Sequence, residues 1–238
     1  MPVASSASRP RVVLAWFFAI PLVVVTVIGL LHHPRAAPLL RVLSPASVCP
    51  LRRGTPEQLD RARALGAAAI LRAGKPAARA PARPALGFEL GRTTLADLRV
   101  WAASHRVTCA ATNGNENLRR CIDVPPSAVA APEVPGPIEE IMFELSSGGT
   151  LVNVQTLRRG LAPSRAAEVA GLLEGETVRA LGAPTSTSGA ATEAHLRSGL
   201  LHSYVAEHVF TDYRATIVAT DLGKSGVMVR EQYLSLAP

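Results

Sequence analysis

The densest group of side chains that could bind a metal or move a proton is His195, His202, His208 and Asp212. Imidazole and carboxylate groups are common zinc ligands, and histidine is the most frequent general base. On one regular strand, His202 and His208 would face the same side but lie about 20 Å apart. One metal ion cannot bridge that distance without a bend, and the spacing of a closed zinc site is absent. We therefore expect surface histidines and no metal or other cofactor, with an enzyme site near His202, His208 and Asp212 as the alternative.

Other patterns associated with catalysis predict structural roles. Gly223-Lys224-Ser225 is similar to the end of a phosphate-binding loop, but Val218 stands where that loop needs a glycine, and a strand follows where it needs a helix. A hairpin turn is expected there. Glu139 and Glu140 are adjacent on a predicted strand and would point to opposite faces, which makes a poor acid–base pair. The sequence also lacks a G-x-S-x-G elbow. We therefore expect a protein that is not an enzyme.

Cys109 and Cys121 stand equally far from Asn115, in two strand-like runs that flank Asn113-Gly114. Asn-Gly is a strong hairpin signal, and a hairpin centred on Asn115 would place the two cysteines opposite each other, close enough for a disulfide. The alternative is a pair of reduced, buried thiols. A disulfide would place the domain outside the cytoplasm. Cys49 is then left for an intermolecular bond or as a free thiol.

Residues 12–31 contain no charged side chain and would rise about 30 Å as a helix, the thickness of the hydrocarbon core of a bilayer. This predicts a single transmembrane helix, preceded by a short basic tail at residues 1–11. The alternative is a cleaved secretory signal, but the apolar block is longer than a signal core and no small-x-small cleavage site directly follows it. We expect an uncleaved signal-anchor.

The net charge of +7 is divided unevenly along the chain. Residues 1–85 carry 12 Arg or Lys against two acidic residues, whereas residues 86–238 carry 13 against 16. The excess positive charge therefore belongs to the N-terminal region, and nucleic-acid binding by the folded domain is not expected. Residues 32–85 are predicted to form a basic juxtamembrane stalk, with a helix at about residues 56–73 and a proline-rich linker after it. Its arginines either contact anionic lipid headgroups or keep a solvated spacer extended; those nearest the span are Arg35, Arg41, Arg52 and Arg53.

The orientation of the predicted span does not follow from charge, because the Arg residues close to its two ends almost balance. The predicted disulfide favours an extracytoplasmic, periplasmic-side domain.

The remainder of the chain predicts an α+β fold of two units in tandem, residues 86–160 and 161–238, each with helix followed by an antiparallel meander. The first unit has a short helix beginning at Thr94, the cysteine hairpin and a second hairpin formed by residues 138–145 and 150–158. The second unit has two short helices between Pro163 and Gly182, followed by strands at residues 201–211, 213–221 and 226–234.

This order resembles β-lactamase inhibitor proteins, whose tandem helix-helix-sheet units are similar to the small lipoprotein of the outer-membrane barrel-assembly machinery. The residues that carry the resemblance are Gly91-Arg92-Thr93-Thr94 with Asp97-Leu98, and Glu176-Thr177-Val178 with Leu181-Gly182-Ala183-Pro184. The membrane anchor and the single intradomain disulfide depart from the inhibitors, so β-lactamase inhibition is not carried over. The resemblance implies a sheet that binds protein outside the cytoplasm. We therefore expect a membrane-anchored binding or scaffolding module of the cell envelope with a protein partner.

Overall fold

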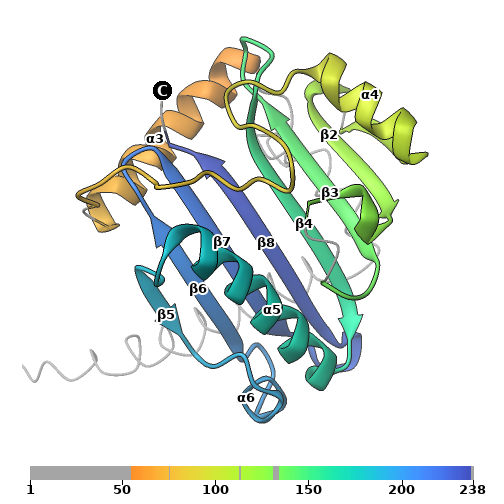
Figure 1. The fold of residues 1–238 in the computed structure, drawn as a ribbon, viewed down its shortest axis with the longest axis vertical. Helices are drawn as coiled ribbons and strands as arrows, with labels where there is room; N and C mark the ends of the chain where they lie inside the picture. Colours follow the sequence, from red (N-terminus) through yellow and green to blue (C-terminus); the bar gives the residue numbers. More distant parts are fainter. Residues whose placement is uncertain (1–54, 75, 113, 131–133, 237–238) are drawn as a thin grey trace, which may run out of the picture. The chain divides into compact units, whose positions relative to one another are not determined.

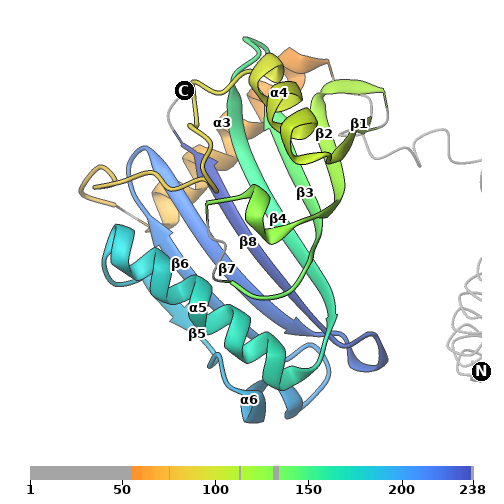
Figure 2. The same cartoon turned by 45° about the vertical axis from the view of Figure 1, so that its right-hand side comes forward.

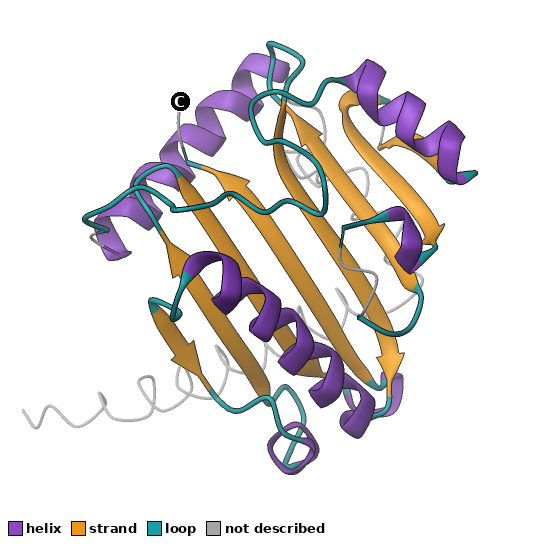
Figure 3. Cartoon of the chain, viewed as in Figure 1, coloured by secondary structure: helices purple, strands orange, loops and turns teal. Residues whose placement is uncertain are grey.

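The computed structural model of the protein describes residues 55–74, 76–112, 114–130 and 134–236. In this part of the chain, eight antiparallel strands form one sheet and helices lie on both of its sides (Figures 1 and 3). The predicted α+β class with antiparallel strands is confirmed.

The two halves of the sheet have a similar order of elements, a helix followed by four strands, with an additional short helix after the first strand of the second half. The first half comprises α4 (Leu95–His105), β1 (Thr108–Thr112), β2 (Asn115–Val124), the 3₁₀ turn η3 (Pro126–Ala128), β3 (Ile138–Leu145) and β4 (Leu151–Leu161). The second comprises α5 (Pro163–Leu181), β5 (Ser186–Ser188), α6 (Glu193–Arg197), β6 (Ser203–Val209), β7 (Tyr213–Asp221), the turn η4 (Gly223–Ser225) and β8 (Val227–Ser235). The strand order is β1-β2-β3-β4-β8-β7-β6-β5, so the last strand of each half lies at the centre. These two strands, β4 and β8, join the halves as an antiparallel pair.

The β1–β2 hairpin forms where the Asn-Gly pair predicts it. Gly114 has φ of 73°, a left-handed conformation that glycine adopts without steric cost. Cys109 lies directly opposite Cys121, and a disulfide joins them. The predicted disulfide is therefore confirmed.

The prediction of two short helices between Pro163 and Gly182 is wrong, because α5 is one continuous helix of 19 residues. Its buried side chains recur at helical spacing along the whole length: Ala166, Val169, Ala170, Leu173, Thr177 and Leu181. Gly171 and Gly175 favour a break on propensity alone, but their backbones lie on the exposed side of the helix. Burial of the continuous apolar side against the sheet outweighs the cost of the two glycines.

A pair of opposite charges is buried at the centre of the face that α5 covers. Arg158 of β4 and Glu231 of β8 are each 1% exposed, and Nη1 of Arg158 lies 3.4 Å from Oε1 of Glu231. Glu231 also accepts hydrogen bonds from the hydroxyls of Thr156, at 2.8 Å, and Tyr233, at 3.0 Å. This network lies where the two halves of the sheet meet.

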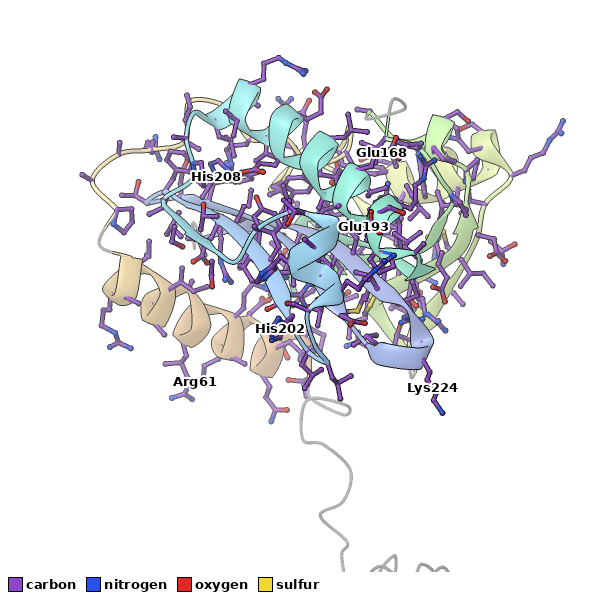
Figure 4. The ribbon with its side chains drawn as sticks, turned by 90° about the horizontal axis from the view of Figure 1, so that it is seen from below. Arg61, Glu168, Glu193, His202, His208 and Lys224 are labelled. Carbon is purple, nitrogen blue, oxygen red and sulfur yellow. A yellow bond between two sulfur atoms is a disulfide. The ribbon has the colours of Figure 1, made fainter. Side chains whose placement is uncertain are left out.

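Helix α3 (Pro56–Gly74) lies on the opposite side of the sheet from α5 (Figures 2 and 4). It begins at Thr55, whose hydroxyl accepts a hydrogen bond from the backbone N–H of Gln58 at 3.4 Å. None of its residues is buried. Polar contacts attach it to the β3–β4 hairpin: Arg63 donates to Oε1 of Glu144 at 2.7 Å, and Asp60 accepts from the backbone N–H of Ser147 at 3.0 Å.

The sequence predicts a proline-rich linker at residues 76–85. In the structure this segment lies against the folded domain and is attached to it by specific hydrogen bonds. The N–H of Ala80 donates to Oδ1 of Asp212 at 3.0 Å, and the carbonyl of Pro84 accepts from the hydroxyl of Tyr213 at 2.5 Å. Ala85 is only 2% exposed. Prolines prevent this segment from forming a helix or strand, but their carbonyls remain available as acceptors for the β6–β7 region.

Within the described residues, no helix is long and apolar enough to cross a membrane. The predicted transmembrane helix at residues 12–31 lies outside those residues. So do Cys49 and the arginines predicted to contact lipid: Arg35, Arg41, Arg52 and Arg53.

Candidate functional site: the open face of the sheet

Strand alternation divides the sheet into two faces of different character. On β8, Val229, Glu231 and Tyr233 are buried on the side of α5, whereas Met228, Arg230 and Gln232 point to the other side and stay partly exposed. Among the described helices, only α3 lies on that other side (Figure 4). We call the part of this face beyond α3 the open face; it comprises Glu140, Met142, Gln155, Leu157, Ser203, Val205, Glu207, Thr216, Val218, Thr220, Met228, Arg230 and Gln232.

The open face is a broad band formed by β3, β4, β8, β7 and β6. One row of directly paired residues crosses it in the order Glu140, Leu157, Arg230, Val218 and Val205. Three of the five are aliphatic. The row therefore presents an apolar surface with a cation near its middle.

Arg230 differs from the other charged residues on this side of the sheet. Glu140 is paired with Arg120, at 2.7 Å, and Arg214 is paired with Glu207, at 2.5 Å. Within the described residues, Arg230 has no hydrogen-bond or ion-pair partner, and its Nε is buried. Burial, together with the nearby charge of Arg214, lowers the pKa of the guanidinium from its ordinary value.

The surroundings of Arg230 raise the free-energy cost of leaving its guanidinium without a hydrogen-bond partner. Leu157 and Val218 lie directly across from it on the adjacent strands, and Met228 and Gln232 are its same-face neighbours on β8. A half-buried guanidinium loses hydration, which only a hydrogen-bonding anion would restore. The open face therefore suits a partner that brings a carboxylate to this position.

Helix α3 borders the open face but packs loosely against the sheet. A cavity of about 430 Å³ lies between them, lined by small or apolar side chains that include Ala64, Ala68, Leu71 and Val152. Polar contacts hold the helix at one end. Burial raises the pKa of Asp60, but hydrogen bonds from Ser147 and Arg63 outweigh that effect and hold the pKa below its ordinary value.

Of the histidine and aspartate residues considered for catalysis, the structure brings His195 and His202 side by side but does not bring His208 or Asp212 to them. The expectation of a surface histidine is wrong for His208, which is 1% exposed because β6 points it to the face covered by α5 (Figure 4). His202 is exposed before the start of β6. The ring of His202 lies beside that of His195, 5.6 Å between centroids, and its Nδ1 contacts the hydroxyl of Ser198. Asp212 accepts the hydrogen bond from Ala80.

A search of the described residues for three or more potential metal ligands in one place finds no such group. Gly223-Lys224-Ser225 forms η4, the turn between β7 and β8, as predicted.

Arg230 is absent from the residues predicted to have a function, although the local pattern of β8 contains a usable signal. In β8, Val227, Val229 and Tyr233 mark the core face by their spacing of two, and Glu231 falls in the same series. Arg230 must therefore lie on the opposite face. Its lack of a partner depends on residues from β4 and β7, which the local sequence does not reveal.

Comparison of the chain with protein-family models, with curated proteins and with solved structures gave no match in any of the three.

Proposed function

We propose that this chain is a membrane-anchored, extracytoplasmic protein-binding or scaffolding module of the cell envelope, and that its open face binds the protein partner. The single observation that carries the proposal is Arg230, which has no partner within the described residues and lies between the aliphatic side chains of Leu157 and Val218 on the open face. Arginines in apolar surroundings are enriched among the residues that dominate protein–protein affinity. The proposed role is binding, without catalysis.

The chemistry of the open face defines what the partner should present. Its matching surface has an aspartate or glutamate that reaches Arg230, surrounded by apolar side chains that cover Leu157, Val218 and Val205. A guanidinium–carboxylate contact is short and directional, so it fixes the register of the complex as well as adding affinity. The apolar rim excludes water from that contact.

Two features support the extracytoplasmic location of the domain and its attachment to a membrane. The Cys109–Cys121 disulfide is typical of proteins outside the reducing cytoplasm. The uncharged block at residues 12–31 has the length of a bilayer span. A topology reporter fused after Pro238, read together with thiol labelling of Cys109 and Cys121, tests this part. A cytoplasmic reporter with reactive thiols would refute it.

Site-specific photocrosslinking in intact membranes tests the binding face. A photoreactive amino acid at Val218 should give a crosslink to one defined protein, and Arg230→Glu in the same chain should remove it. The expected loss of binding free energy is about 2 kcal/mol or more. The matched control is the same photoreactive residue at Leu172, which is 40% exposed on α5, on the other side of the sheet.

The proposal fails if Val218 gives no defined crosslink, or if Leu172 gives the same crosslinks as Val218. It also fails if Arg230→Glu leaves the crosslink unchanged. Thermal unfolding followed by circular dichroism verifies that the variant remains folded.

The alternative, an enzyme that uses His202, His208 and Asp212, has no comparable support. Catalytic groups must lie within hydrogen-bond reach of a common substrate, and these three side chains occupy separate parts of the domain.

A further inference from the structure

A second candidate site lies on the helix-covered side of the sheet, away from the open face. A cavity of about 500 Å³ opens between α4 and the strands β1, β2 and β3. This volume falls within the range of about 300 to 1,000 Å³ that is usual for small-molecule sites. Its apolar lining includes Leu95, Leu98, Ala102, Val107 and Phe143, together with the disulfide-bonded residues Cys109 and Cys121.

The cavity exists because α4 packs against the sheet less closely than its counterpart α5. Helix α5 buries six side chains, whereas α4 buries only Leu98 and Ala102. An aromatic cluster holds α4 in place beside the cavity: the ring of Trp101 lies 5.5 Å from Phe143 and 5.2 Å from Phe88 between centroids. Trp101 also donates from Nε1 to the carbonyl of Ala128 at 2.8 Å. The helix is therefore anchored at a fixed distance from β1 and β2.

Charged side chains line the same cavity. Arg119 is only 13% exposed and is paired through Nη2 with Glu116, while Arg99 lies 3.9 Å from the same carboxylate. Two cations thus share one anion, which leaves one positive charge in excess. The Nε of Arg119 is buried and has no hydrogen-bond partner within the described residues. The excess positive charge beside an apolar cavity favours a ligand that brings one negative charge.

We propose that this cavity binds a small apolar molecule that carries a single carboxylate. The apolar body lies against Leu98, Phe143 and the disulfide, where it displaces poorly ordered water from apolar surface. The carboxylate lies beside the guanidinium groups of Arg119 and Arg99, which line the cavity, and balances the excess positive charge. The ligand site is independent of the open face and of its protein partner.

Calorimetric titration of the full-length protein in lipid nanodiscs with 2-naphthoate tests the proposal, with 2-naphthamide as the neutral analogue and empty nanodiscs subtracted. We expect saturable binding of the carboxylate with one ligand per chain. Arg119→Gln and the neutral analogue should each bind at least about tenfold more weakly.

Two further variants distinguish occupancy of this cavity from binding elsewhere. Ala103 is exposed and lines the cavity, so Ala103→Trp should block it and abolish binding without disturbing the core. Val100 is 70% exposed on the same helix and does not line the cavity, so Val100→Trp should bind as the wild type does. Arg92→Gln is the matched charge control, since Arg92 is 83% exposed.

Absence of saturable 2-naphthoate binding to the wild-type protein would overturn the proposal. So would binding that survives Ala103→Trp, or that responds equally to Arg119→Gln and Arg92→Gln. Photocrosslinking at the open face involves none of these residues, so failure of the ligand site and failure of the protein-binding proposal can be told apart.

Discussion

Glu231→Gln should be one of the most destabilising conservative substitutions in this protein. The carboxylate lies 3.4 Å from the Arg158 guanidinium, and both side chains are 1% exposed. With an effective dielectric constant of about 20, two unit charges at that separation attract by about 5 kcal/mol. The substitution keeps the shape of the side chain and one acceptor oxygen, enough for the hydroxyl of either Thr156 or Tyr233. It leaves the buried cation without an opposite charge.

The free energy of unfolding should fall by about 3 to 5 kcal/mol, the range measured when one partner of a buried ion pair is removed. Arg158→Met should cost a similar amount, because it leaves the carboxylate buried and uncompensated. The double variant Arg158→Met/Glu231→Gln should cost much less than the sum of the two, since it removes both charges and keeps one of the two acceptor oxygens. The coupling between the two sites should therefore be about 2 kcal/mol or more.

Urea unfolding of the full-length protein, followed by far-UV circular dichroism, measures these changes in unfolding free energy. They appear as shifts of the urea midpoint with an unchanged m-value. Glu139→Gln is the matched control, because Glu139 and its partner Arg159 are 45% and 44% exposed, and an exposed pair should contribute under about 1 kcal/mol. The reasoning is refuted if Glu231→Gln costs no more than Glu139→Gln, or if the two single variants of the buried pair are additive.

Two further predictions concern His208 and the disulfide. Burial lowers the pKa of His208, and the opposing effect of Glu174 is smaller. The unfolded chain therefore takes up this proton at a higher pH, about 6.5, than the folded protein does. Stability should fall as the pH drops below about 6.5, by at most about 1.4 kcal/mol per pH unit from this group. His208→Leu should remove that contribution, seen by comparing urea midpoints at about pH 7.5 and about pH 5.5; an unchanged pH dependence would contradict the prediction. Replacing Cys109 and Cys121 together by alanine opens a loop whose ends are 12 residues apart and should cost about 3 kcal/mol. A reductant should lower the urea midpoint of the wild type by a similar amount and leave that of the variant unchanged.

The elements that the sequence predicted well are those with local signals. The hairpin around Gly114 and the pairing of Cys109 with Cys121 follow from turn chemistry and from counting residues on each side of the turn. The capping pattern at Thr94 and Asp97 likewise marks the start of α4, and the structure forms both of its hydrogen bonds. These signals lie within a few residues of the feature that they specify.

The elements that it missed depend on contacts between distant segments. The tandem pattern predicted two meanders, but no local signal shows that β4 pairs with β8 to give one sheet. The exposed glycines of α5 suggested a break that burial on the other side of the helix prevents. The lack of a partner for Arg230 and the cavity beside α4 depend in the same way on how separate elements pack. The resemblance to tandem-repeat inhibitors stays a prediction.

The central position of β8 also constrains how the chain reaches this structure. During synthesis the first half can form β1 to β4 early, but β4 then exposes a full edge of unpaired backbone groups until β8, the last strand of the sheet along the chain, has been made. Such an edge pairs readily with other chains, and closure across so long a separation in sequence is slow. Folding therefore succeeds only if nascent copies stay apart during that interval, so aggregation before β8 has been made is the main hazard for this topology.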